Sequence, residues 1–365
     1  MSINRIYDMW FRWLMQLWPS GSRSRLRNAA WFLAGLHESH SVQLHWIARK
    51  IPGVAKLPSR IRRLTRFLQS PRWPVRPSYA PIATVLIQDL VHTLGEIRLI
   101  ADGSRVAFHH QLLLISIAYR RRAIPLAWTW IPSARGHSSA WRQLALLAYV
   151  RQLIPPGTPV LLVGDTEFEA VAVQTQVDAW GWKYVLRQKP NNQVRRAPHA
   201  VWQNFASLVT KPGQRVWWSG ADLTSKHQYR VNLLAYWQVG EKEPWLLATN
   251  LPTPEDTRRA YHRRMWTEEL FGDLKGHGFD LGSTHLQHIA RLSHLTLLVV
   301  FLYVWMFLAG IRTIKCGERH FVDRHDRRDL SVFQIGWRFI DWLGSNGVPL
   351  PNALKPIWLL KMSGS

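Results

Sequence analysis

The order of strand and helix patterns between residues 98 and 187 constrains the fold of this chain more than any other feature. Three short β-rich segments separated by polar turns come first, and a helix, a strand, a second helix and a further strand follow. The predicted strands are Arg98–Val106, Leu112–Tyr119, Ile124–Ile131, Pro159–Gly164 and Lys183–Arg187, and the predicted helices are Ser139–Leu153 and Ala170–Trp180. A three-stranded antiparallel meander followed by helix–strand–helix–strand is the order of a ribonuclease-H-like α/β core.

The regions on either side of this core have different patterns. Polar turns separate three further strand patterns, Arg215–Trp218, Tyr229–Gln238 and Trp245–Ala248, and a helix follows that starts after Pro254 and runs to Gly276. A last helix is expected at Ser331–Leu343. We therefore predict a helical domain at 1–92, a core built from 93–190 and 251–315, a β-rich insertion at 191–250 and a C-terminal helical region at 316–365.

An uncharged run of 17 residues, Leu295–Ile311, is at the short edge of what could span a membrane. It stands alone in a strongly charged chain, so the pattern favours a buried core helix. A membrane role is the alternative, and we expect no membrane partner.

The chain carries 47 Lys and Arg against 23 Asp and Glu, a net charge of +24. A surplus of this size predicts a polyanionic partner, and nucleic acid is the first candidate because each cation placed on a phosphate releases a counterion. An anionic membrane surface and a merely basic soluble protein are the alternatives.

The single cysteine, Cys316, excludes a disulfide framework and a zinc cluster of cysteines. The stretch around Asp8 and Arg12 makes a poor secretory signal, so we expect a cytoplasmic protein.

A basic helix face is predicted after Ser59, which is a plausible N-cap. Apolar residues fall on one side of this helix, while Arg62, Arg63 and Arg66 fall on the other with no acid to pair with them inside the helix. Such a face is usually only solvated. Here we predict that the three arginines contact the DNA backbone.

Acidic residues are scarce, so their positions are informative. No Asp or Glu occurs in the 62 residues between Asp102 and Asp165. Each of these two aspartates sits at a predicted strand: Asp102 follows apolar residues in RLIADGS, and Asp165 ends PVLLVGD. A lone aspartate at a strand end is usually a turn former. The first and fourth strands of the predicted fold are neighbours, however, so both carboxylates are expected to converge.

A third carboxylate is predicted from the helix after Pro254. At 100° per residue, Tyr261, Arg264, Glu268 and Lys275 share a stripe of about 60° that Glu269 and Asp273 do not join. An amphipathic helix with an ordinary Arg264–Glu268 pair is the alternative. Two Asp and one Glu without His or Cys form a hard-oxygen set that suits Mg²⁺ or Mn²⁺, with two ions expected.

The spacing Tyr261-x2-Arg264-x3-Glu268-x6-Lys275 resembles the Tyr-Arg-Glu-Lys signature of bacterial insertion-sequence transposases of the cut-and-paste, insertion-sequence-four type. These are DDE enzymes with a ribonuclease-H-like core. Asp102 and Asp165 stand where the first two acids of that family are expected, and a β-rich insertion before the Glu is also a family trait. The resemblance covers roughly residues 20 to 340.

The resemblance implies a metal-dependent DNA strand transferase with Asp102, Asp165 and Glu268 as its catalytic metal ligands. It also implies that Tyr261, Arg264 and Lys275 contact terminal phosphates. The expected partner is double-stranded DNA, both terminal inverted repeats and target, bound by a homodimer to which the C-terminal region contributes. Trp217 and Trp218 are candidates for stacking on a flipped base, although buried strand tryptophans are commoner.

One departure from the family pattern follows the second aspartate. Relatives often have Arg there, whereas this chain has Thr166 and then Glu167, which becomes a rival ligand. Two other functions remain open: a structure-specific nuclease on the same core, and a catalytically inactive DNA-binding repressor.

Overall fold

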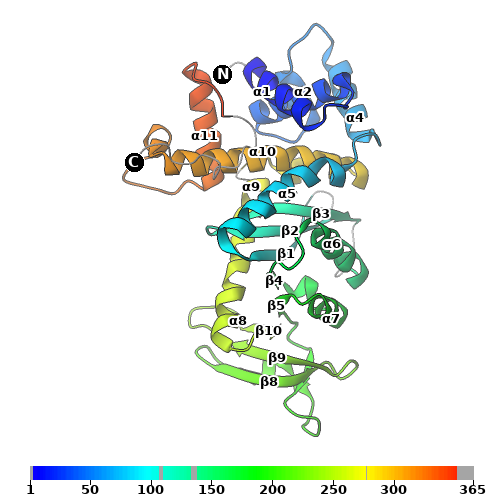
Figure 1. Ribbon diagram of the computed structural model, residues 1–365, viewed down its shortest axis with the longest axis vertical. Helices are drawn as coiled ribbons and strands as arrows, with labels where there is room; N and C mark the ends of the chain where they lie inside the picture. The colour runs from blue at the N-terminus through cyan, green and yellow to red at the C-terminus, as the bar shows by residue number, and fades with distance from the viewer. Residues whose placement is uncertain (1–2, 107–109, 133–137, 277, 352–365) are drawn as a thin grey trace. The chain divides into compact units, whose positions relative to one another are not determined.

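The computed structural model describes residues 3–106, 110–132, 138–276 and 278–351, which form two compact units (Figure 1). The sheet unit comprises the described parts of Leu90–Ser104 and Gln111–Glu268. The helical unit comprises those of Met1–Asp89, Arg105–His110 and Glu269–Ser365. The N-terminal helices, predicted as a domain of their own, therefore belong to the same unit as the C-terminal helices.

The sheet unit contains a ten-stranded sheet in the order β3-β2-β1-β4-β5-β10-β9-β8-β6-β7. Its first five strands are β1 (Ile97–Arg105), β2 (Gln111–Tyr119), β3 (Arg122–Ile131), β4 (Val160–Gly164) and β5 (Lys183–Arg187). β2 and β3 are antiparallel, whereas β1, β4 and β5 run parallel. Every predicted core strand is present within two residues of its expected ends, and the order is consistent with the predicted ribonuclease-H-like core.

The strands predicted as an insertion extend the same sheet. They are β6 (Gln193–Arg195), β7 (Gln203–Asn204), β8 (Arg215–Leu223), β9 (Tyr229–Tyr236) and β10 (Trp245–Thr249). β10 joins the two halves because it pairs antiparallel with both β5 and β9. The segment predicted as a β-rich insertion thus continues the core sheet.

Helices cover the central strands of this sheet. α6 (Ala140–Leu153) contacts β2 and β3, and α7 (Val171–Ala179) contacts β5. Figure 1 shows these two helices on one side of the sheet and α8 (Pro254–Tyr261) on the other. Coverage on both faces explains why β4 is a continuous apolar run, VLLVG, without polar alternation.

The single helix predicted from Pro254 to Gly276 is interrupted. α8 passes into a 3₁₀ turn, His262–Met265, before α9 (Trp266–Leu274) begins. The tighter winding shifts the angular phase of later residues, so the predicted stripe of about 60° does not hold across the turn. Arg264 lies in this turn, and its ion pairs, described below, stabilise the local geometry.

The helical unit is built around α10 (Ile289–Lys315), which contains the uncharged run. Its other helices are α1 (Ile3–Leu17), α2 (Arg23–Ser39), α3 (Leu44–Lys50), α4 (Leu57–Gln69), α11 (Val332–Ser345) and the first part of α5 (Val75–Leu94). α10 is long and apolar enough to cross a membrane, as core helices also are, and its most apolar window is entirely buried by the rest of the chain. α2, α4 and α11 all contact it.

Two helix starts in this unit show how local sequence sets the boundaries. α4 begins at Leu57 rather than after Ser59, because Pro58 is well suited to the first turn of a helix. α11 begins where predicted, with Ser331 and Gln334 forming a reciprocal capping box. Gly336 lets α11 approach α10 closely, since a Cβ there would collide with the carbonyl oxygen of Met306.

Candidate active site

Asp102 lies within β1, and Asp165 directly follows β4, the strand that pairs parallel with β1. Ala101 lies opposite Gly164 in this pairing, so an aspartate comes next in the chain at both positions. Asp102 is 2% exposed, and the backbone N–H of Gly103 donates to its Oδ1 at 2.8 Å. Residues in register on parallel strands point to the same face, so the structure brings together the two carboxylates that the sequence placed at neighbouring strands.

The guanidinium of Arg264 connects three carboxylates. Its Nη2 lies 3.2 Å from Oδ2 of Asp102 and 3.2 Å from Oδ2 of Asp165. Its Nη1 donates to Oε1 of Glu268 at 3.0 Å. The Arg264 side chain is only 16% exposed, whereas that of Glu268 is 55% exposed. Asp102, Asp165 and Glu268 thus gather around one cation in the sheet unit.

The electrostatics of this cluster are set by burial and by opposite charge. Burial raises the pKa of Asp102 to about 6, even though Arg264 opposes that rise. Burial alone would lower the pKa of Arg264, but Asp102 and Asp165 more than offset it and the net shift is upward. Arg264 therefore stays charged and holds together acids that would otherwise repel one another.

A divalent ion fits the chemistry of these residues. Three carboxylates without a His or Cys supply hard oxygen donors, and they already converge on a cation. As the described side chains stand, no three His, Cys, Asp or Glu residues are arranged to hold a metal ion. The guanidinium of Arg264 lies among the three carboxylates that would hold the metal ion.

The other residues of the predicted Tyr-Arg-Glu-Lys stripe have different environments. Tyr261 is buried at the end of α8, where its ring packs edge-on against Trp245 with centroids 5.1 Å apart. Burial and the nearby charge of Asp165 raise the pKa of the Tyr261 hydroxyl, which therefore stays protonated. Lys275 follows α9 in the helical unit, and its Nζ lies 5.7 Å from the ring centroid of Phe271.

The remaining acids near the motif are engaged elsewhere or exposed. The backbone N–H and hydroxyl of Ser138 both donate to Oε1 of Glu167, so this rival ligand holds the segment before α6. Glu169 binds Lys189. Asp273 is buried and accepts a hydrogen bond from the Ser331 hydroxyl at 3.2 Å, while Glu269 is exposed.

The candidate tryptophans are half-buried on β8. Trp217 lies opposite Leu234 and Trp218 opposite Leu233 of β9. Neither is fully buried, so each leaves part of its ring accessible. A role in stacking on a base stays a prediction.

The sequence did not point to a cavity of about 470 Å³ that adjoins Asp165. Arg187, Trp237 and Lys242 are among its lining residues. The Nη2 of Arg187 lies 3.1 Å from Oε2 of Glu243. Arg187 ends β5, which pairs parallel with β4 and so places this arginine near Asp165. Lys242 and Trp237 could not have been found from the sequence. They lie in the segment between β9 and β10, and only the pairing of β10 with β5 brings that segment near Asp165.

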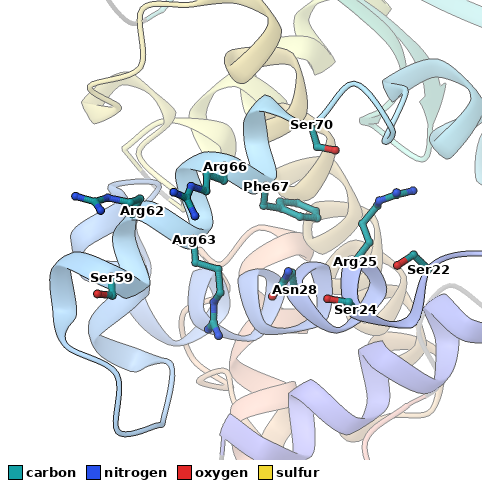
Figure 2. Close-up of a pocket in the computed structure, with 10 residues that line it drawn as sticks. All are labelled: Ser22, Ser24, Arg25, Asn28, Ser59, Arg62, Arg63, Arg66, Phe67 and Ser70. Carbon is teal, nitrogen blue, oxygen red and sulfur yellow. The ribbon is translucent and has the colours of Figure 1, made fainter.

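The predicted basic face lies in the helical unit. Arg62, Arg63 and Arg66 are exposed on α4, along a groove between α4 and α2 (Figure 2). The groove also contains Arg25 and Asn28 from α2, which the sequence did not single out.

A family match covers Asp165 and Glu268 but not Asp102. Residues 133–305, just under half of the chain, match the family described as Transposase DDE domain. No curated protein matches the sequence. A solved structure described as the cryo-EM structure of piggyBac transposase synaptic complex with hairpin DNA aligns with 93% of this chain and 78% of that chain, at 10% identity and a TM-score of 0.42. A score at that level carries no weight for the fold or for function. The family match supports a DDE-type transposase and does not resolve the Tyr-Arg-Glu-Lys group within it.

Proposed function

We propose that this protein is a DDE transposase that cuts DNA at the ends of its element and joins the freed ends to target DNA. The observation that carries the proposal is the convergence of Asp102, Asp165 and Glu268 on a single cation. The match of residues 133–305 to the Transposase DDE domain supports the same reaction class.

In this proposal the three carboxylates hold Mg²⁺ or Mn²⁺, two ions in the working site. Bound there, the ions supply activation of the attacking oxygen and stabilisation of the leaving oxygen of a phosphodiester. Asp102 and Asp165 contribute ligands fixed by adjacent strands, which cost little reorganisation. Glu268 contributes a ligand from a helix, on the solvent-exposed side of the cluster where DNA has access.

The cationic side chains of the motif position the phosphates. Arg264 presents a forked donor suited to a phosphate, and Lys275 supplies a point charge. Tyr261, protonated and buried beside Asp165, orients the turn that carries Arg264. Trp217 and Trp218 contact a base displaced from the duplex end.

The assembly and compartment are part of the same proposal. The protein acts as a homodimer on paired DNA ends, with the C-terminal helical region contributing to the dimer. It acts in the bacterial cytoplasm, at the nucleoid, where its DNA substrate lies.

The test is a strand-transfer assay on the full chain with Mg²⁺ or Mn²⁺ and duplexes bearing the inverted repeats that flank the coding sequence. Joined product supports the transposase. Cleavage without joining supports a structure-specific nuclease on the same core, and binding without cleavage supports a repressor.

A further inference from the structure

The charge of residues 9–88 is almost uncompensated. This stretch contains 13 Lys and Arg and a single acid, Glu38. A folded surface with so few counter-charges of its own attracts an external polyanion. The question is which of these cations are free to bind one.

The arginines on α4 divide into two kinds. Arg60 is committed to the fold, because its Nη1 donates to the carbonyl oxygens of Ala48 at 3.2 Å and of Ile51 at 2.5 Å. Arg62, Arg63 and Arg66 have no hydrogen bond or ion pair to any described residue. These three are exposed and hold no part of the helical unit together.

The free arginines line a groove of about 610 Å³ between α2 and α4. Figure 2 shows Arg62, Arg63 and Arg66 on α4 and Arg25 on α2. The rest of the lining is short and polar apart from one ring: Ser22, Ser24, Asn28, Ser59, Ser70 and Phe67. Serine and asparagine are common donors to phosphate oxygens.

We propose that this α2–α4 groove binds the phosphodiester backbone of duplex DNA without reading its sequence. Arg62, Arg63 and Arg66 are distributed along α4, and Arg25, which also donates to the carbonyl oxygen of Arg72 at 2.8 Å, adds a cation from α2. This distribution suits a linear polyanion better than a single phosphate. Phe67 is only 7% exposed, so the groove offers no ring on which an unpaired base could stack. The inference rests on the proposed function only for the identity of the polyanion.

A membrane surface fits this groove poorly. Membrane-surface helices insert an apolar face into the lipid. The apolar face of α4, formed by Leu64, Phe67 and Leu68, is buried inside the helical unit. The exposed side of α4 therefore carries three arginines and no large apolar side chain.

The experiment compares two triple variants of the full chain that remove the same charge. Arg62, Arg63 and Arg66→Gln empties the groove of free cations, and Arg324, Arg327 and Arg328→Gln removes three exposed arginines elsewhere in the helical unit. Dissociation constants are measured between 50 and 200 mM salt on a random duplex and on one carrying the inverted repeat. The slope of log K against log salt should become about 2.7 less steep in the groove variant. Between 50 and 200 mM salt, the affinity of the wild type should therefore fall about forty-fold more than that of the variant, equally on both duplexes.

Each other outcome overturns the proposal in a different way. An unchanged slope, or an equal loss in the control, means that the groove does not bind DNA. A loss confined to the inverted repeat means that the groove reads sequence. Loss of binding to vesicles containing an anionic phospholipid, with DNA binding intact, assigns the groove to a membrane. None of these readouts requires DNA cleavage, so they are independent of the catalytic proposal.

A second inference comes from the carboxylate cluster and rests on the proposed function. We infer that Arg264 is a built-in counter-cation that a divalent ion must displace. One guanidinium within 3.2 Å of three carboxylates offers each of them a partner, so metal binding has to break these ion pairs. A DNA phosphate accepts the displaced guanidinium, and metal and DNA therefore favour each other's binding.

The test is a calorimetric titration of the full chain with Mn²⁺, with and without duplex DNA. Arg264→Gln should bind Mn²⁺ about ten-fold more tightly than the wild type in the absence of DNA. Added DNA should tighten Mn²⁺ binding by the wild type and leave the variant unchanged. Arg263→Gln, which removes a charge from the same turn, is the matched control and should behave like the wild type.

Equal Mn²⁺ affinity in Arg264→Gln and the wild type overturns the counter-cation role. If the Gln variant does not fold, Arg264→Lys replaces it in the titration. A single ammonium cannot span three carboxylates, so the Lys variant should also bind Mn²⁺ more tightly than the wild type. Failure of the proposed function looks different: Glu268→Gln would then bind Mn²⁺ as well as the wild type.

Discussion

The carboxylate cluster of the sheet unit and the arginine groove of the helical unit differ in whether the chain itself supplies the opposite charge. Asp102, Asp165 and Glu268 are neutralised in part by Arg264, which reaches all three. Arg62, Arg63 and Arg66 have no described partner. One cluster is compensated from within the chain, and the other depends on a partner.

The difference follows from burial. Asp102 is almost fully buried, and a buried charge without a partner is costly, so the fold supplies a cation. The groove arginines are exposed, where water solvates them and their mutual repulsion is screened. A buried site for a small cation therefore needs a cationic side chain of the protein when no ion is bound. An exposed surface for a polyanion needs no anionic side chain of its own.

The largest expected effect tests whether the compensated cluster is the reaction centre. Glu268→Gln should lower cleavage and strand transfer by about three orders of magnitude or more, because loss of one metal ligand removes several kcal/mol of charge stabilisation. DNA affinity in a filter-binding assay with a chelator present should stay unchanged. Glu269→Gln, a neighbour on α9 that is exposed, is the control and should keep nearly full activity. Retained cleavage in Glu268→Gln would contradict the assignment.

The next effect concerns how much the buried carboxylate of Asp102 lowers the free energy of unfolding. The pKa of Asp102 rises from about 3.8 in the unfolded chain to about 6 in the folded protein. Folding therefore favours the protonated form: this contribution is fully present below pH 3.8 and is lost as pH rises through 6. Asp102→Asn, which resembles the protonated acid at every pH, should become more stable than wild type above pH 6, by about 3 kcal/mol.

The measurement is urea unfolding of both proteins between pH 4.5 and 8 with a chelator present. The stability difference should grow with pH and level off above about pH 7. A difference that does not change with pH would show that Asp102 is not protonated more readily in the folded state.

Local patterns predicted the parts of the site that depend on neighbours in sequence. Asp102 and Asp165 were found because each is an isolated acid at an apolar strand, and adjacency of β1 and β4 follows from the order of elements. The Arg264–Glu268 pair follows from helical spacing. The core strands were equally predictable, since each is a short apolar run between turns.

Long-range contacts decided what the sequence could not predict. Glu167 looked like a rival ligand until the fold placed Ser138 beside its carboxylate. The 3₁₀ turn around Arg264 depends on carboxylates about a hundred or more residues away. The α2–α4 groove required the packing of two helices that no local pattern relates.

The smallest effect separates structural arginines from free ones on the same helix. Arg60→Gln should lower the free energy of unfolding by about 1–3 kcal/mol, because the carbonyl oxygens of Ala48 and Ile51 lose a charged donor. Arg62→Gln, two residues away and without a described partner, should change stability by less than about 0.5 kcal/mol. Urea unfolding of the two variants side by side checks both values. A large loss in Arg62→Gln would mean that the groove arginines support the fold, and the contrast between an internally compensated cluster and a groove reserved for a partner would then fail.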